Sequence, residues 1–124
     1  MKAYYSVGNR SVILEATSEE IEKLFKETYG VDVKYDKIYD FSLMSVATFN
    51  YYNEFIDHIY YNIFVPSWGL SEDQADAVRG FIDDDAMLYE LDMSGEYGMF
   101  YVADRNEYLL INWELTRYDL QAED

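Results

Sequence analysis

Short runs of β-branched and aromatic residues predict strands in the first part of the chain. Two of them, Ala3–Val7 and Ser11–Glu15, flank the turn-forming sequence Gly8-Asn9-Arg10, so a hairpin or a bent strand is expected there. Apolar and polar residues also alternate over Val31–Tyr35, which predicts a further strand. This strand continues irregularly through three apolar positions, Ile38, Tyr39 and Phe41.

A helix is predicted between these strands. Thr17 and Glu20 have the spacing of a capping box, in which each side chain accepts a hydrogen bond from the backbone N–H of the other residue. The next apolar positions recur at helical spacing, Ile21, Leu24 and Phe25, and the pattern ends near Gly30. Residues 1–48 are therefore expected to form an N-terminal ββαβ module.

Apolar stripes at helical spacing predict two helices in the second part of the chain. The first runs from Phe49 to Phe64 and stops before Pro66. Its apolar positions are Tyr52, Ile56, Ile59 and Ile63. The second begins with another capping box, from Ser71 to Gln74, and ends near Tyr89. Its apolar positions are Ala75, Val78, Ile82, Ala86 and Tyr89.

The C-terminal residues predict a β-hairpin. Two apolar runs, Tyr97–Val102 and Tyr108–Trp113, flank the turn signal Asp104–Glu107. The acidic tail Tyr118–Asp124 is expected to fray. Residues 49–124 thus predict a module made of a helical pair and a hairpin. Together the two modules are expected to form one compact α+β unit, with small antiparallel sheets, about three helices and a C-terminal β-hairpin.

The chain is strongly acidic. It contains 25 Asp and Glu residues against 9 Lys and Arg, so its formal net charge is −16 with the single His neutral. A folded protein of this size has roughly 6,900 Å² of surface, or about one carboxylate per 280 Å². Such crowding destabilises the compact state, because the carboxylates repel one another. It is expected only where the charge provides solubility or binds a partner of opposite charge. Nucleic acid and anionic membranes are excluded as expected partners, because Lys and Arg supply most of the affinity for phosphate.

Other features of the composition concern the cellular compartment. There is no cysteine, which excludes disulfides, thiol catalysis and thiolate metal sites. The sequence has no signal-peptide pattern, and no apolar stretch approaches the roughly 20 residues that span a bilayer. We therefore expect a soluble protein of the cytoplasm.

No motif predicts catalysis, a metal ion or a cofactor. His58 is expected to be a partly exposed helix residue, because neither a partnered nucleophile nor a second ligand accompanies it. Consecutive helix residues point about 100° apart, so Asp83, Asp84 and Asp85 do not converge on one ion. The turn Asp104-Arg105-Asn106 lacks the glycine and the glutamate of a calcium loop. With 25 acids some pair is always close, so a small hydrolase with two catalytic carboxylates stays an alternative.

The third predicted helix carries a ridge of acidic residues. Six of them lie mostly opposite its apolar stripe: Glu72, Asp73, Asp76, Asp83, Asp84 and Glu90. At 1.5 Å per residue the ridge is about 27 Å long. Duplex DNA presents a phosphate about every 1.7 Å of its axis, so one ridge is too sparse to imitate it alone. Five further acids complete the candidate partner-binding surface: Glu19, Glu20, Asp85, Asp92 and Glu96. The alternative is a solvated face that only provides solubility.

Two stretches of the chain resemble a known family. The clearer stretch consists of three pieces, Phe81-Ile82-Asp83, Ala86 and Glu90–Gly95. The other consists of Ala3-Tyr4-Tyr5, the helix Glu19–Lys26, and Tyr35 through Tyr39-Asp40-Phe41. Together they cover about half of the chain. They are similar to the ArdA antirestriction family, small acidic proteins of plasmids, transposons and phages that mimic DNA and inhibit type I restriction-modification enzymes.

The resemblance implies an inhibitor rather than an enzyme, without a cofactor. ArdA proteins are longer and have three modules, whereas this chain lacks most of the middle one and has Tyr89 where the family tends to have Arg. A shortened relative could block a CRISPR effector instead of a restriction enzyme, and a homodimer is left open. The alternative function is that of an immunity protein or antitoxin that neutralises a basic nuclease toxin, because its composition would be the same.

Overall fold

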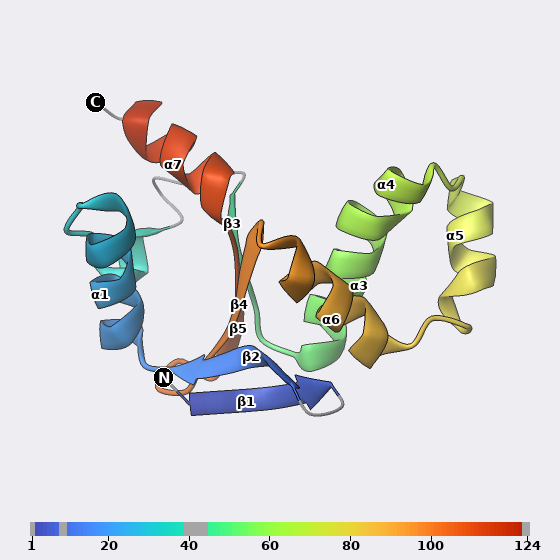
Figure 1. Cartoon of the computed structure of the whole chain (residues 1–124), viewed down its shortest axis with the longest axis horizontal. Helices are drawn as coiled ribbons and strands as arrows, with labels where there is room; N and C mark the ends of the chain where they lie inside the picture. Colours follow the sequence, from blue (N-terminus) through green and yellow to red (C-terminus); the bar gives the residue numbers. More distant parts are fainter. Residues whose placement is uncertain (1, 8–9, 39–44, 123–124) are drawn as a thin grey trace.

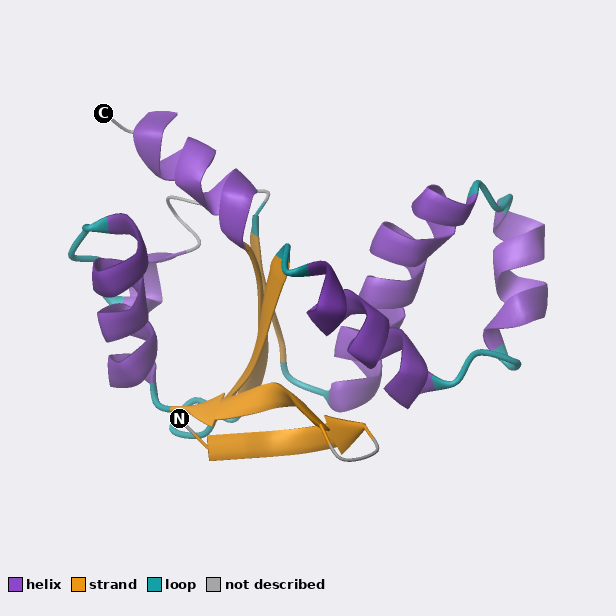
Figure 2. Ribbon diagram, viewed as in Figure 1, coloured by secondary structure: helices purple, strands orange, loops and turns teal. Residues whose placement is uncertain are grey.

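The computed structural model describes residues 2–7, 10–38 and 45–122. The chain adopts a mixed α+β fold in which helices cover both faces of a central sheet (Figure 1), and the strands are drawn in orange in Figure 2. On one side lie α1 (Ser18–Tyr29) and α7 (Trp113–Ala122). The helical segments between residues 52 and 94 lie on the other side.

The sheet has five strands in the order β1-β2-β4-β5-β3. Their bounds are β1 Lys2–Val7, β2 Arg10–Ala16, β3 Val46–Phe49, β4 Tyr97–Val102 and β5 Glu107–Asn112. Strands β2 and β4 are parallel, whereas the other neighbouring pairs are antiparallel. Of the two alternatives for the N-terminal strands, the structure shows the hairpin, and the predicted C-terminal hairpin is confirmed except that its second strand ends at Asn112. The sheet is mixed rather than purely antiparallel, and it joins strands from residues 1–48 with strands from residues 49–124.

The central strands separate two apolar clusters because alternate side chains of a strand point to opposite faces. On β5, Tyr108 and Leu110 pack in the cluster that contains Phe55 of the helical side. The intervening Leu109 and Ile111 pack in the cluster that contains α1 and α7. Burial on both faces explains why the run of apolar residues in β5 is nearly continuous.

The predicted first helix is confirmed, together with both of its ends. The Thr17 side chain accepts a hydrogen bond from the Glu20 N–H, and the Glu20 carboxylate accepts one from the Thr17 N–H, which completes the capping box. Gly30 ends the helix with a φ of 74°, in the left-handed region that a residue without Cβ adopts at little cost.

The strand predicted at Val31–Tyr35 is wrong. Val33 and Tyr35 are buried, as the alternation implies, but they pack in the cluster that contains α1 rather than in the sheet. The Tyr35 N–H donates to a carboxylate oxygen of Glu22 on α1 at 2.7 Å, and the 3₁₀ turn η1 (Tyr35–Lys37) follows. The alternation of apolar and polar residues in this segment therefore reflects burial against α1 and not a β-strand. The predicted continuation over residues 39–41 lies outside the described residues.

The second predicted helix begins and ends later than expected. It consists of α3 (Tyr52–Ile59), the π-helical turn η2 (Tyr60–Phe64) and α4 (Val65–Trp68). The prediction that it stops before Pro66 is wrong. Pro66 lies in the first turn of α4, directly after the π-helical turn, and a residue without an N–H is tolerated in the first turn of a helix.

The third predicted helix is two helices, α5 (Glu72–Arg79) and α6 (Asp84–Ser94). The capping box at the start of α5 is confirmed. Gly80 ends α5, and Asp83 in an extended conformation caps α6. The prediction of a single acidic ridge about 27 Å long is therefore wrong. Helices α5 and α6 run in different directions on either side of a short connection (Figure 1). This division and the presence of α7 make the prediction of about three helices too low.

The residues after β5 are also more regular than expected. Trp113, predicted as the end of the last strand, begins α7, and the described part of the tail continues this helix to Ala122. Leu120 anchors it in the cluster that contains α1. Among the residues that the structure describes, no helix combines the length and the apolar character needed to cross a membrane.

A candidate acidic protein interface

Charge is distributed unevenly over the fold. Residues 52–94, called the helical lobe below, contain ten Asp and Glu residues and a single basic residue, Arg79. Residues 17–38, which form α1 and the segment that packs on it, contain six acidic residues and four lysines. The negative charge is therefore concentrated on the side of the sheet that carries α3 to α6.

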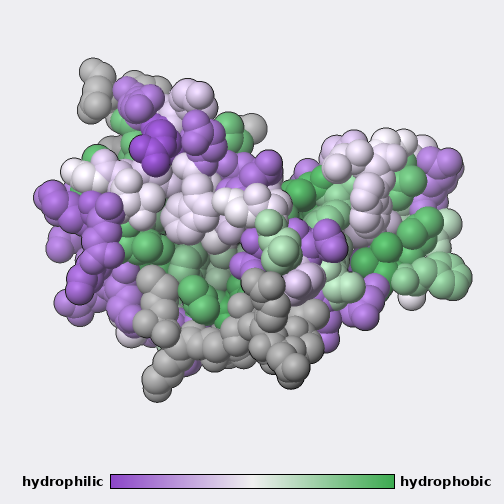
Figure 3. Space-filling model, viewed as in Figure 1, coloured by the Kyte–Doolittle hydropathy of each residue, from purple (hydrophilic) through white to green (hydrophobic). Residues whose placement is uncertain are grey.

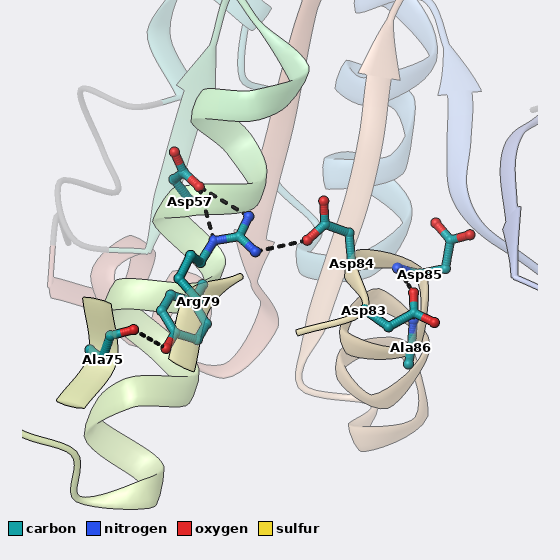
Figure 4. Close-up of polar contacts among 8 residues, drawn as sticks. Asp57, Ala75, Arg79, Asp83, Asp84, Asp85 and Ala86 are labelled. Atoms are coloured by element: carbon teal, nitrogen blue, oxygen red, sulfur yellow. Dashed lines mark hydrogen bonds and ion pairs between the residues drawn. The ribbon is translucent and has the colours of Figure 1, made fainter. Parts of the chain in front are cut away.

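Arg79 is held by two carboxylates from neighbouring elements (Figure 4). Its Nη2 lies 3.1 Å from Asp57 Oδ1 on α3, and its Nη1 lies 3.0 Å from Asp84 Oδ1 on α6. The guanidinium also stacks over the ring of Tyr60, 5.2 Å from its centroid. Burial opposes the charge of Arg79, but the hydrogen bonds to Asp57 and Asp84 outweigh it and raise the pKa of the guanidinium. The one cation of the helical lobe is thus already paired, and the lobe supplies no other for its remaining acids.

Helix α5 presents three exposed carboxylates, those of Glu72, Asp73 and Asp76. The helix is attached through the buried Ala75, whose carbonyl accepts a 2.6 Å hydrogen bond from the Tyr60 hydroxyl. The Tyr61 hydroxyl, also of η2, donates to Asp76 Oδ1 at 2.9 Å, and this bond raises the pKa of Tyr61. These two hydrogen bonds attach α5 to η2, and its three carboxylates remain exposed to solvent.

The acids of α6 have mixed roles. Asp83 Oδ1 accepts hydrogen bonds from the N–H groups of Asp85 and Ala86, so this carboxylate caps the helix (Figure 4). Asp84 pairs with Arg79, and Asp85 is half-buried. Three further predicted site residues lie along or just after α6: Glu90 is exposed, Asp92 is half-buried, and Glu96 is exposed in the turn before β4. Part of the predicted cluster therefore stabilises the fold itself.

The remaining predicted site residues, Glu19 and Glu20, lie elsewhere. They belong to the first turn of α1, on the other side of the sheet from α5 (Figure 1). The Glu20 carboxylate accepts the Thr17 N–H, and this hydrogen bond lowers the pKa of Glu20. The structure thus brings the candidates of α5 and α6 into one lobe and leaves these two apart from it.

Two acidic residues of the helical lobe were absent from the predicted set. Glu54 and Asp57 lie on the exposed side of α3. A signal for them exists in the sequence: apart from Arg79, no Lys or Arg occurs between Lys37 and Arg105. The long interval without basic residues marks the lobe better than the acidic residues alone.

Apolar side chains also reach the surface of the helical lobe. An open cavity of about 200 Å³, called the apolar groove below, lies among η2, α4, the α5–α6 connection and α6. Its apolar lining comprises Phe64, Trp68, Phe81, Ile82, Ala86 and Met87. Phe81 is 89% exposed and Trp68 48% exposed. In Figure 3, hydrophobic surface (green) interrupts hydrophilic surface (purple) over the helical lobe, on the right of the view.

His58 is half-buried on α3. Its ring lies 4.8 Å from the ring of Phe49, and the Asn62 side-chain amide donates to its backbone carbonyl at 3.1 Å. Burial lowers the pKa of His58. Within residues 2–7, 10–38 and 45–122, no group of three or more His, Asp or Glu residues could hold a metal ion.

Acidification is expected to cost more stability in the presence of His58 than in its absence. Because the folded protein disfavours the charged imidazole, the unfolded chain binds more protons as the pH falls below the ordinary His pKa of about 6.5. The free energy of unfolding, measured with urea between pH 7.5 and pH 5, should fall further in the wild type than in His58→Gln. The comparison cancels the titration of the carboxylates, and parallel curves would contradict the burial of His58.

Arg79→Gln is expected to lower the free energy of unfolding by about 1–2 kcal/mol. The substitution removes two ion pairs from a side chain that is only 24% exposed, and it restores repulsion between α3 and α6. Urea denaturation measures the change. The matched control is Lys26→Gln, which breaks the exposed Lys26–Asp32 pair and should cost less than about 0.5 kcal/mol. Equal losses would show that Arg79 does not hold the lobe together.

The acids, the paired arginine and the apolar groove are all on one side of the molecule, formed by residues 52–94. Such a surface is suited to contact with another protein, because it combines charge with exposed aromatic residues. Comparisons of the chain with protein-family models, with curated proteins and with solved structures give no match.

Proposed function

We propose that the protein is an inhibitor whose helical lobe occupies the DNA-binding groove of a bacterial defence protein. The carboxylates of the lobe take the positions of phosphates and pair with the Lys and Arg residues of that groove. The observation that carries the proposal is the charge of the lobe, ten acidic residues with one cation that is already paired. Inhibition of this kind requires neither catalysis nor a cofactor, and it operates in the cytoplasm of the host cell.

The uneven distribution of charge favours this role over simple solubility. Solubility depends on net charge and gains nothing from concentrating like charges on one side of the fold. Concentration costs stability, because the carboxylates of α3, α5 and α6 repel one another. A basic partner would turn this cost into binding free energy, since its cations would neutralise several carboxylates at once.

The arrangement of α5 and α6 also suits a surface that imitates DNA. A single helix would place its carboxylates in one row, whereas two short helices that run in different directions spread them over an area (Figure 1). Duplex DNA likewise presents its phosphates on two strands rather than in one row. The exposed Glu54 of α3 widens the acidic area further, whereas Asp57 on the same helix is paired with Arg79.

The class of target follows from the resemblance to ArdA proteins. Its clearer stretch covers residues 81–95, which form the α5–α6 connection and α6. This stretch lies in the acidic helical lobe, so the resemblance and the charge point to the same surface. A type I restriction-modification enzyme is therefore the first target to test, and a CRISPR effector is the second.

A cleavage assay tests the proposal. Purified type I restriction enzyme and a purified CRISPR nuclease each cleave their DNA substrate in the presence of increasing amounts of the protein. We expect inhibition of at least one of them, and the concentration needed for half inhibition should rise in proportion to added duplex DNA. Inhibition that excess DNA does not relieve would contradict occupation of the DNA-binding groove. Inhibition of neither enzyme, with neutralisation of a basic nuclease toxin instead, would favour the immunity function.

A further inference from the structure

The apolar groove is not explained by charge imitation. DNA phosphates have no apolar counterpart, yet Phe81 is 89% exposed and Trp68 is 48% exposed at this groove. Contiguous apolar surface on a monomer often marks a place where another molecule binds, and large aromatic residues contribute much of the energy of protein interfaces. Ile82, next to Phe81 in the chain, is packed against the core of the helical side. The connection between α5 and α6 therefore holds Phe81 outward while its neighbour is anchored.

The charges around the groove identify the kind of molecule that fits it. Two carboxylates, those of Asp83 and Glu90, belong to its lining, and the surrounding lobe contains only one cation. A second copy of the chain would bring two acidic lobes together, and an anionic lipid surface would be repelled. A segment that combines an apolar side chain with Lys or Arg residues is complementary in both respects.

We propose that the apolar groove binds an apolar side chain on a basic amphipathic helix of the partner. This inference rests on the proposed function and adds to it an anchor that does not depend on charge. The groove lies between helical segments, η2 and α4 on one side and α6 on the other, and such grooves accept the apolar face of a partner helix. The Lys and Arg residues of that helix then face Asp83 and Glu90. Binding of an apolar side chain in the groove would let the protein distinguish one basic partner from another. Charge alone discriminates poorly between basic proteins.

Two synthetic helical peptides test this inference. One consists of Leu and Lys with Leu at helical spacing, and the other is identical except that every Leu is replaced by Ala. Their affinities for the full-length protein are measured by calorimetry at low salt. We expect the wild type to bind the Leu peptide at least about tenfold more tightly, because burial of one large apolar side chain has an effect of this size.

Three variants locate the effect. Phe81→Ala removes the exposed aromatic ring, and Ala86→Trp fills the groove from an exposed position. Both should bring the affinity ratio of the two peptides close to one while the Ala peptide binds as before. The matched control is Met93→Ala, which removes an apolar side chain that is 54% exposed on α6 outside the groove lining, and it should keep the wild-type ratio. Circular dichroism confirms that each variant is folded.

The outcomes separate this inference from the proposed function. Equal, salt-sensitive affinities of the wild type for both peptides would overturn the apolar anchor and leave inhibition by charge intact. If the wild type bound neither peptide, the acidic lobe would not attract basic segments, and the proposed function would fail as well. A wild-type dimer in sedimentation that Phe81→Ala dissociates would show that the groove holds a second copy of the chain, which also overturns the inference.

Discussion

Replacement of Glu72, Asp73 and Asp76 by their amides is expected to weaken inhibition by about 10- to 100-fold, because each rim charge contributes up to about 1 kcal/mol to association. These three residues are exposed on α5, and none of them belongs to α6 or to the lining of the apolar groove. The concentration for half inhibition of DNA cleavage measures the effect. Most of the loss should appear in the association rate, which falls when attractive charges are removed.

The matched control changes the net charge equally on the other side of the sheet. The residues Glu19, Glu27 and Glu114 are exposed on α1 and α7, and the triple variant with Gln at these positions should inhibit nearly as well as the wild type. Equal losses in both triple variants would mean that only the total charge matters. Full activity of the α5 variant would remove α5 from the interface. The control also tests the prediction that placed Glu19 in the partner-binding surface.

Gly98→Ala is expected to lower the free energy of unfolding by about 2–4 kcal/mol. A Cβ at this position of β4 would lie 2.3 Å from Cζ2 of Trp113 and 2.8 Å from Cε2 of Phe100, so the rings must shift. Trp113 begins α7, and its carbonyl accepts a 2.8 Å hydrogen bond from the Tyr29 hydroxyl of α1. Displacement of this ring would therefore loosen α1 and α7 together. Urea denaturation measures the change.

Gly80→Ala is the control for this substitution. A Cβ at Gly80 would meet no atom within 4 Å, and the residue has an ordinary φ of −68° at the end of α5. Its replacement should be neutral or stabilise the protein by up to about 1 kcal/mol, because Ala restricts the unfolded chain. Losses of similar size at both positions would contradict the close packing of Trp113 on β4.

Elements whose signals are local were predictable from the sequence. The capping boxes at Thr17 and Ser71 and the two hairpins were predictable, because each capping box joins residues three positions apart and each hairpin pairs strands that follow one another in the chain. The division of the third helix also had a local signal. Gly80 and the cap residue Asp83 mark it, but the Asp83 carboxylate suits an acidic ridge as well as a helix cap, so the sequence alone does not distinguish the two roles.

Features that depend on distant contacts were not predictable in this way. Val31–Tyr35 alternates like a strand, yet the Tyr35 N–H finds its acceptor on Glu22 of α1, thirteen positions earlier. The sequence likewise shows how many acids the chain has but not which of them oppose one another across the fold. The pairing of Arg79 with Asp57 and Asp84 depends on how α3, α5 and α6 pack together, and the sequence pattern does not show this packing. The exposure of Phe81 beside the half-buried Ile82 is equally a property of the tertiary structure.

The central claim is that the helical lobe binds a basic DNA-binding groove through its charge. The most direct test is the displacement of labelled duplex DNA from the restriction enzyme by the protein, followed by fluorescence anisotropy between about 50 and 500 mM salt, where the screening length falls severalfold. Salt also weakens the binding of the labelled DNA, because DNA and this protein are both negatively charged. The affinity of the protein for the enzyme is therefore calculated separately at each salt concentration. We predict that this affinity falls steeply with salt, and less steeply in the α5 triple variant. An affinity that does not change over this range would contradict the account.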